Sequence, residues 1–476
     1  MRLLCIVLLV ICLVLQAPPT FAGDQFEAGM GVVDITPVSG YRMSGYFSER
    51  LNTGTLDPLL AKAVVMRQGD TQAAIVFCDL IGISHDVSQR ARTQTQQITG
   101  IPAEHISIAA THSHTGPMYF GALRQHFHEH QVAQKGGDPY EVTDYPTELT
   151  GRLVRAVMIA QENLKPVSLH AGYANEDRLS FNRRFHMTSG PVRFNPGHLN
   201  PNIVRPAGPI DPEVGLVSFT PQDATTPQAA IVAFALHLDT LGGSMYSADY
   251  PRYVQEVLHE SYGDTFISLF GAGTCGDINH IDVTKPAPEG RRKTNEIGSM
   301  LGQTVAEELP KLKDVSQPSL AVARAVVDVK LQKFTAEEID LARAMMDRVD
   351  DSGVPFLERV KAYSIMAAQL RGSETIGLEV QVFRLSNDVA IVTLPGEVFV
   401  DLGLAIKQVS PFETTIVIEL ANDAPGYIPT RRAFVEGSYE TVNSRIVSGS
   451  GEEMVDAAIQ LLHELGSPND DTQQVE

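Results

Sequence analysis

The segment ATHSHTGP, residues 110–117, places two histidines one residue apart among three hydroxyl side chains. It follows the largely apolar run 106–110, which predicts a buried strand. Alternate side chains of a strand share a face, so we expect His112 and His114 to point the same way and serve one site. Imidazole binds metals and carries protons near neutral pH. The pair indicates a metal or catalytic site, and the alternative is two hydrogen-bonded histidines with a structural role.

A second histidine and a carboxylate also follow apolar runs. His237 comes after the run 229–236, and Glu397 follows a Pro-Gly corner after the run 389–394. Alone, His237 would be interpreted as a core histidine bonded to a backbone carbonyl, but two strand-end histidines favour a shared site. Two histidines and a carboxylate are a common catalytic zinc set that leaves a position open for water.

A glycine-rich segment, FGAGTCGDINH at residues 270–280, follows another apolar run. Its glycines would let the backbone approach a ligand closely, and Asp277, Asn279 and His280 supply polar groups. The spacing matches no Walker or Rossmann phosphate pattern. The alternative is a tight turn without a ligand.

The remaining pattern predicts the fold class. Buried strands are expected from the apolar runs 73–78, 106–110, 229–236, 265–270, 320–331, 378–385, 389–394 and 414–420. Helices are expected over 87–98, 253–262, 299–312, 335–349 and 452–465. The sequence thus predicts an α/β fold with mixed buried sheets flanked by helices and an active site at the strand ends. Residues 182–212, rich in proline, are expected to form an irregular rim over that site.

Charge and the first residues bear on partners and location. The chain of 476 residues is 43% hydrophobic and carries a formal charge of −20, which argues against nucleic-acid partners and docking on anionic membranes. Arg2, the apolar run 3–15 and small residues before position 22 predict a secretory signal peptide over 1–22. The protein is therefore expected to be exported, periplasmic or secreted, with an uncleaved anchor as the alternative. No later segment is apolar enough to span a membrane.

Cysteine chemistry is limited. Removal of the signal would leave Cys78 and Cys275, both in apolar surroundings. Two small buried residues are the favoured interpretation, and one disulfide is the alternative. No cysteine-based zinc site can be built from them.

Seven motifs in order resemble the neutral/alkaline (non-lysosomal) ceramidase family, zinc-dependent amidases that cleave the N-acyl bond of ceramide. The resemblance covers about residues 28–440. The motifs are GVVDITPVSGY, ISIAATHSHTGP, SFNRR, FALHLDTLGGSMYSADYPRY, GTCGDINH, LPGE and GYIPT…GSYE. The resemblance implies a zinc amidase acting on ceramide, yielding sphingosine and a fatty acid, or on a related lipid amide.

The family roles map onto individual residues. The resemblance implies that zinc is held by His112, His237, Glu397 and Tyr427. It places His114 near the substrate and the zinc-activated water, where it could pass a proton to the leaving amine. Arg183 would face the substrate and Tyr439 would line the pocket, so both could stabilise the oxyanion.

Two departures from the family pattern affect what is expected. Asn279 stands where the family has a serine, so a serine nucleophile is excluded there, and Asn279 is expected to donate a hydrogen bond to substrate. We expect a catalytic domain over 23–466, a frayed polar tail over 467–476, and no counterpart of the family's C-terminal immunoglobulin-like domain. The alternatives are a zinc hydrolase acting on a non-lipid amide or ester, an inactive ligand-binding homologue, and a metal-free protein.

Overall fold

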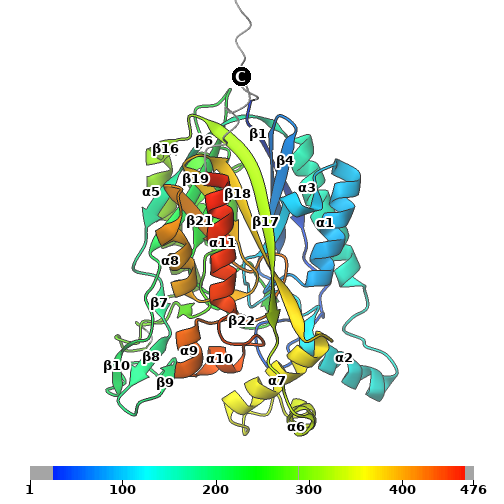
Figure 1. Cartoon of the computed structure of the whole chain (residues 1–476). Coiled ribbons are helices and arrows are strands. Elements are labelled where there is room, and N and C mark those ends of the chain that lie inside the picture. Colours follow the sequence, from blue (N-terminus) through cyan, green and yellow to red (C-terminus); the bar gives the residue numbers. More distant parts are fainter. Residues whose placement is uncertain (1–24, 288, 467–476) are drawn as a thin grey trace, which may run out of the picture.

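The computed structural model of the chain describes residues 25–287 and 289–466 (Figure 1). Its largest element is a nine-stranded sheet. In order across the sheet the strands are β14 (Ile267–Ala272), β12 (Ala229–Phe234), β11 (Glu213–Pro221), β6 (Lys165–Asn175), β1 (Glu27–Asp34), β3 (Leu60–Gln68), β4 (Thr71–Cys78) and β5 (Ile106–Ala110), with β16 (Lys313–Asp314) paired to β6. The pairs β12–β14 and β4–β5 are parallel, and the pairs between them are antiparallel.

A four-stranded sheet packs face to face on the first. Its strands are β17 (Pro318–Lys330), β18 (Thr375–Ser386), β19 (Val389–Thr393) and β21 (Thr414–Ile418), and the pair β19–β21 is parallel. One apolar core between the sheets contains Phe77 and Leu269 from the large sheet and Phe383 and Ile391 from the small one. Strands covered on both faces explain the continuous apolar runs of the sequence.

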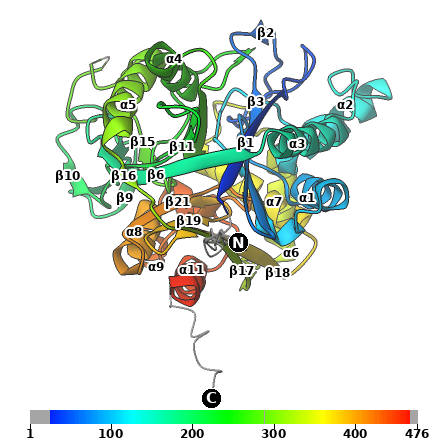
Figure 2. The same ribbon diagram turned by 90° about the horizontal axis from the view of Figure 1, so that it is seen from above.

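Helices cover the outer faces of both sheets (Figure 2). The helices are α1 (His85–Thr99) and α3 (Tyr145–Glu162) beside β1 and β3–β5, α4 (Pro251–Tyr262) and α5 (Thr294–Glu308) beside β11, β12 and β14, and α8 (Val400–Val409) and α11 (Ser450–Gly466) on the four-stranded sheet. The predicted α/β class, with mixed buried sheets flanked by helices, is confirmed.

Local sequence fixes several helix ends. Ser84 accepts a hydrogen bond from the Val87 amide at the start of α1, and Gly100 closes that helix at φ 78°. Thr335 and Glu338 form the predicted capping box of α6 (Ala336–Met346), which ends three residues before the predicted boundary at 349.

One end of the molecule, the lower end in Figure 1, includes the helices α2 (Gly121–Lys135), α7 (Phe356–Leu370), α9 (Arg431–Glu436) and α10 (Tyr439–Val442) and the strands β8 (Arg184–Met187), β9 (Val192–Phe194) and β10 (Ile203–Pro206). Four two-residue strands form two further pairs, β7 (Phe181–Asn182) with β15 (Ile278–Asn279) and β20 (Glu397–Val398) with β22 (Tyr427–Ile428). The remaining ones are β2 (Gly54–Thr55), β13 (Met245–Tyr246), η1 (Ala103–His105) and η2 (Leu309–Lys311). The irregular segment predicted over 182–212 is wrong in part, because β8, β9 and β10 pair there into a three-stranded sheet.

Three further expectations concern cysteines, membranes and the termini. Cys78 and Cys275 are both free and buried, as favoured from their apolar surroundings. No helix among the described residues has the length and apolarity that a membrane crossing needs. The signal peptide over 1–22 and the polar tail over 467–476 lie outside the described residues.

Candidate active site

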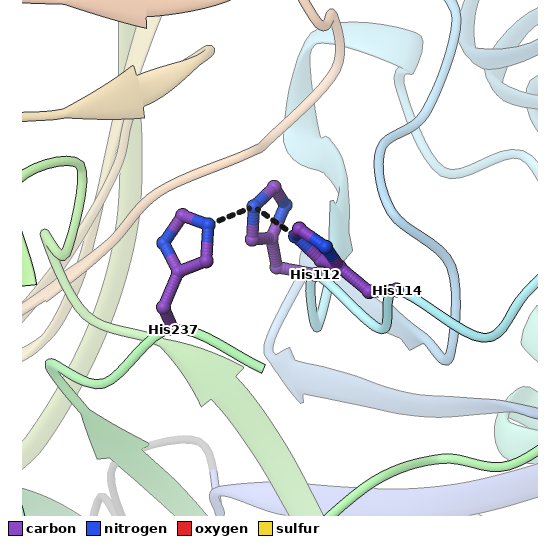
Figure 3. Close-up of side chains that lie close together, drawn as sticks. All are labelled: His112, His114 and His237. Atoms are coloured by element: carbon purple, nitrogen blue, oxygen red, sulfur yellow. Dashed lines mark hydrogen bonds between the residues drawn. The ribbon is translucent and has the colours of Figure 1, made fainter. Parts of the chain in front are cut away.

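Three imidazoles meet where the carboxyl ends of strands converge. His112 lies two residues beyond β5 and His237 three residues beyond β12, and their Nε2 atoms are 2.9 Å apart. The Nε2 of His114 is 3.3 Å from that of His112 (Figure 3). The expected proximity of His112 and His114 is present, but the strand expected to produce it is not. The strand stops at Ala110 and His112 adopts φ 79°, so a turn of the loop, and not strand alternation, joins the two side chains.

The hydroxyl residues of the same segment hold this turn in place. Ser113 Oγ and Thr115 Oγ1 both donate to the Ser247 carbonyl, at 2.7 and 2.9 Å. The His112 amide donates to the Leu80 carbonyl at 2.9 Å. These hydrogen bonds support the left-handed conformation at His112.

The outward ring nitrogens determine where the lone pairs point. His112 Nδ1 lies 2.7 Å from the Ile81 carbonyl oxygen, and His237 Nδ1 lies 3.3 Å from that of Cys275. A carbonyl oxygen only accepts, so in the neutral rings each Nδ1 carries the proton and each Nε2 keeps a lone pair. Two lone pairs facing each other across 2.9 Å repel unless a cation lies between them. This arrangement fits a metal site.

Glu397 adds a carboxylate to the same point. Its Oε2 is 3.5 Å from His112 Nε2 and 3.9 Å from His237 Nε2. Parallel pairing of β20 with β22 sets Glu397 opposite Tyr427, after a corner at Gly396 with φ 77°. Tetrahedral zinc with bonds of about 2.0–2.1 Å would separate its ligand atoms by roughly 3.3 Å, which the observed separations bracket.

The ionisation states also suit a metal. Burial, followed by the neighbouring His112 ring, lowers the pKa of His114 from 6.5 to about 4. Burial likewise lowers the pKa of His237 well below its ordinary value. Burial opposes ionisation of Glu397, but the adjoining imidazoles and Tyr427 hold its pKa below the ordinary range. A neutral His237 and an ionised Glu397 are the forms in which these two groups bind metals.

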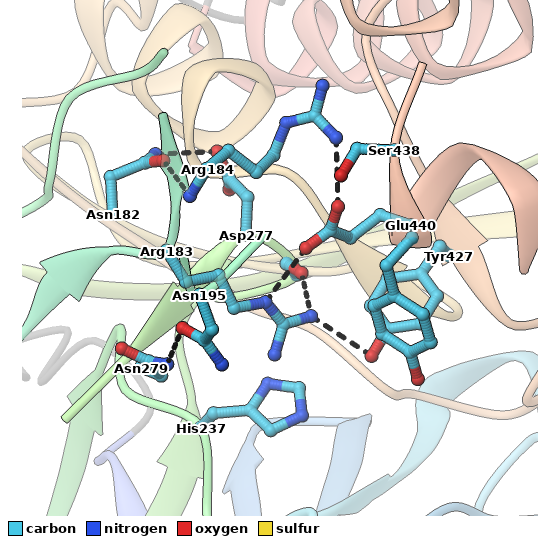
Figure 4. Close-up of polar contacts among 12 residues, drawn as sticks. Asn182, Arg183, Arg184, Asn195, His237, Asp277, Asn279, Tyr427, Ser438 and Glu440 are labelled. Atoms are coloured by element: carbon cyan, nitrogen blue, oxygen red, sulfur yellow. Dashed lines mark hydrogen bonds and ion pairs between the residues drawn. The ribbon is translucent and has the colours of Figure 1, made fainter. Parts of the chain in front are cut away.

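Arg183 is fixed against this centre by three acceptors (Figure 4). Its Nε donates to Glu440 at 2.9 Å, and its Nη2 donates to the Gly276 carbonyl at 2.7 Å and to the Tyr427 hydroxyl at 3.1 Å. Burial disfavours its charge, but Tyr427 and Glu440 keep the pKa of Arg183 well above its ordinary value. Its Nη1 makes no hydrogen bond to the described residues and points toward His237 in Figure 4.

Two tyrosines complete the polar wall. Burial and the nearby Glu397 carboxylate raise the pKa of Tyr427 well above its usual value, and its hydroxyl is hydrogen-bonded to that carboxylate. The Tyr439 ring lies 5.5 Å from the Tyr427 ring, and its oxygen accepts from Asn443 Nδ2 at 3.2 Å. Burial also raises the pKa of Tyr439, so its hydroxyl stays protonated at neutral pH.

Asn279 is placed differently from the other predicted residues. It is 1% exposed, its Nδ2 donates to Asn195 at 2.9 Å, and its Oδ1 accepts from the Ile281 amide at 3.0 Å. It does not line the cavity in front of the histidines. Both ends of its amide therefore bond to protein. Only the second Nδ2 hydrogen is left without a protein acceptor.

A cavity of about 140 Å³ opens in front of this centre. His112, His114, Glu397, Tyr427 and Tyr439 form its polar side. Its other walls include Tyr46, Phe47, Met118, Phe120, Leu123, Tyr363, Asn443 and Arg445. Apolar walls with a few convergent polar groups are typical of ligand sites.

Two acidic residues of this region, Glu419 and Asp239, were not predicted from the sequence. Glu419 is fully buried, accepts from Cys275 Sγ at 3.1 Å and from the Val398 amide at 2.6 Å, and burial raises its pKa well above the ordinary value. It follows the apolar strand β21, so the strand-end rule applied elsewhere would have found it. Asp239 lies 3.3 Å from His280, a residue already named in the glycine-rich segment, and only the fold brings the two together.

Comparison with known proteins identifies a shared fold. No protein-family model and no curated protein matches the chain significantly. The solved structure of neutral ceramidase from Pseudomonas aeruginosa matches with 20% identity and a TM-score of 0.66, over 94% of this chain and 76% of that one. A ceramidase complexed with C2 matches with 18% identity and the same TM-score, over 93% of this chain and 76% of that one. The chain therefore has the fold of these ceramidases, as the motif resemblance implied.

Proposed function

We propose that this chain is a zinc-dependent hydrolase that cleaves an N-acyl amide bond. The observation that carries the proposal is the convergence of His112 and His237 lone pairs with the Glu397 carboxylate at the bottom of a cavity. The ceramidase fold supports amide hydrolysis as the reaction. A metal-free interpretation requires a proton, in place of the metal, between the two Nε2 atoms.

The metal ligands are His112, His237, Glu397 and Tyr427. Zinc, when bound, lowers the pKa of a water molecule and polarises the substrate carbonyl. The protein holds the ligand set through bonds behind it, because backbone carbonyls fix both Nδ1 atoms and Arg183 orients the Tyr427 hydroxyl. A fixed set of this kind favours the ligated geometry before the metal arrives.

His114 is the proton carrier. It lines the cavity, is more exposed than the two other histidines, and its Nδ1 has no hydrogen-bond partner in the described part of the chain. With a pKa of about 4 it is neutral at pH 7 and can accept a proton from the attacking water. It then delivers that proton to the departing amine nitrogen.

Arg183 and Tyr439 stabilise the oxyanion that forms when the carbonyl is attacked. The Arg183 Nη1 is free to donate, and the Tyr439 hydroxyl remains protonated and faces the cavity. Donors that are already oriented cost little reorganisation in the transition state. Asn279 acts on substrate only indirectly, through the loop that carries Asn195.

The proposal also covers the domain bounds, the location and the substrate. We assign residues 23–466 to the catalytic domain and residues 1–22 to an export signal, which makes the protein periplasmic or secreted. The apolar wall formed by Phe47, Met118 and Phe120 suits an acyl chain. The substrate is ceramide or another amide with one acyl chain.

Hydrolysis assays with purified protein test this function. C12-ceramide and simple N-lauroyl amides should be cleaved by protein containing zinc, and chelation should abolish turnover until zinc is restored. The variant His114→Gln should keep its zinc but lose about 10²-fold or more in kcat. Full activity of the chelated protein, or no cleavage of any amide, would contradict the proposal.

A further inference from the structure

Arg445 brings an unpartnered guanidinium to the cavity of the proposed active site. The residue is 7% exposed and lines the same cavity as His114 and Tyr439. Its Nε has no hydrogen-bond partner, and no acidic side chain among the described residues pairs with it. A buried guanidinium without a partner is costly, so a native fold retains one where a ligand completes it.

Other buried arginines of the chain show the contrast. Arg42 pairs with Asp138, and both Arg183 and Arg184 pair with Glu440. Each of these cations has its counter-charge inside the protein. Arg445 has none, although the chain as a whole carries 20 more negative than positive charges.

Gly426 leaves room for the Arg445 side chain. A Cβ added at Gly426, which has φ +92°, would lie 1.9 Å from Arg445 Nη1, so any other residue there would displace the guanidinium. The Tyr363 ring covers the cation, with Cζ 5.1 Å from the ring centroid. The guanidinium is therefore seated beside Tyr427, the residue that follows Gly426.

The backbone that carries Arg445 is held on both sides. The Gln332 amide donates to the Arg445 carbonyl at 2.8 Å, and Ser444 Oγ donates to the Tyr427 carbonyl at 2.9 Å. The position of Arg445 is thus tied directly to the candidate ligand Tyr427. A group bound by Arg445 would lie at a fixed place relative to the centre.

Asn443 adds a second unsatisfied atom beside the same cavity. The residue is 6% exposed, and its Oδ1 has no donor although its Nδ2 bonds to Tyr439. That oxygen is enclosed by protein, so the Arg445 side chain is the charged group that lines the cavity without a counter-charge. A ligand that pairs with it carries an anionic group.

We infer that the substrate carries a carboxylate on its amine side, as an N-acyl amino acid does, and that Arg445 binds it. This inference rests on the proposed amide hydrolysis and narrows its substrate class. The two oxygens of a carboxylate match the donor fork of a guanidinium. Ceramide is neutral and would leave Arg445 without a counter-charge.

A pair of matched amides tests the inference. N-lauroylglycine and N-lauroylethanolamine differ in the carboxylate, and N-lauroyltaurine presents a sulfonate in its place. Wild-type protein should have a kcat/KM about tenfold or more higher for N-lauroylglycine than for N-lauroylethanolamine. The variant R445Q should raise KM for N-lauroylglycine by about tenfold or more, and this loss should be several-fold larger than any loss for N-lauroylethanolamine. R445K should restore part of the preference, and zinc content should be unchanged in both variants.

The outcomes separate this inference from the proposed function. Equal losses for both amides in R445Q, or a wild-type preference for the ethanolamine amide, would overturn the carboxylate assignment while zinc-dependent hydrolysis stood. A preference for N-lauroyltaurine would overturn the carboxylate in favour of a sulfonate. Calorimetry with the H114Q variant measures binding without turnover. Tight binding of N-lauroylglycine that is lost on adding R445Q would support the anion site even if no amide were cleaved.

Discussion

Two groups of side chains in this molecule have the spacing of a metal site, and they differ in charge. One is the histidine centre, formed by His112, His114 and His237. The other is the loop cluster, which we define as His128, Asp138 and Glu141 at α2 and the segment after it. In each group the candidate ligand atoms lie within 4.8 Å of one another.

The loop cluster already holds its cations. Arg42 Nη1 is 2.5 Å from Asp138 and 3.2 Å from Glu141, and Arg124 pairs with Glu141 as well. A metal there would have to displace a guanidinium whose side chain is fully buried. The histidine centre has no such cation between its ligand atoms, and its Nε2 lone pairs face one another. Proximity of ligand atoms is therefore insufficient evidence for a metal site unless their lone pairs are free.

The largest expected effect is loss of the metal from the histidine centre. His237→Ala should reduce zinc content from about one per chain to near zero, because it removes a ligand from a site of four. His128→Ala is the matched control and should leave zinc content unchanged. Elemental analysis of both purified variants measures the zinc content per chain. Equal zinc contents in the two variants would contradict the proposed difference between the clusters.

Removing the cation of the loop cluster should be the next largest effect. Arg42→Met leaves Asp138, Glu141 and Glu49 without their shared buried partner. The free energy of unfolding should fall by about 3–5 kcal/mol, as for other broken buried pairs. Urea denaturation measures it, and zinc content in the folded variant should stay near one per chain. A loss below about 1 kcal/mol would show that the cluster is held in some other way.

The histidine centre should contribute to the pH dependence of stability. In the metal-free protein His114 has a pKa near 4, against an ordinary 6.5. Between these values the unfolded chain binds more protons, so stability is greatest above pH 6.5 and is lost as pH falls toward 4. His114→Asn should remove on the order of 1–3 kcal/mol of that loss, measured by urea denaturation at pH 7 and 4.5. An equal loss of unfolding free energy between pH 7 and 4.5 in variant and wild type would argue against a neutral, desolvated His114.

The smallest effect is expected at the exposed side of the loop cluster. His128 is about one-third exposed and pairs with carboxylates that Arg42 already neutralises. His128→Ala should change the free energy of unfolding by about 0–1 kcal/mol. Thermal unfolding of this variant and of Arg42→Met compares their stabilities. A similarly large loss of stability in both would mean that His128 contributes as much to holding the loop as Arg42 does.

The strand ends explain why much of the site was predictable. Apolar runs marked β5, β12 and β19, and His112, His237 and Glu397 follow these strands within four residues. The three strands belong to separate parallel pairs, β4–β5, β12–β14 and β19–β21, so the sequence predicted polar strand ends but not which of those ends would meet.

Other parts depend on contacts across long stretches of chain. Glu419 meets Cys275 over 144 residues, and Arg183 meets Glu440 over 257. The left-handed turn at His112 and the pairing of β8 with β9 and β10 also have no periodic signal in the sequence. Arg445 was not predicted because what distinguishes it is the lack of a counter-charge, and a sequence does not show which residues lack one.

Anomalous diffraction at the zinc edge tests the central claim most directly. Crystals of the protein with one equivalent of zinc should show one strong peak, within about 2.0–2.3 Å of His112 Nε2, His237 Nε2 and a Glu397 oxygen. No peak at that point, or a stronger one at His128, Asp138 and Glu141, would contradict the account.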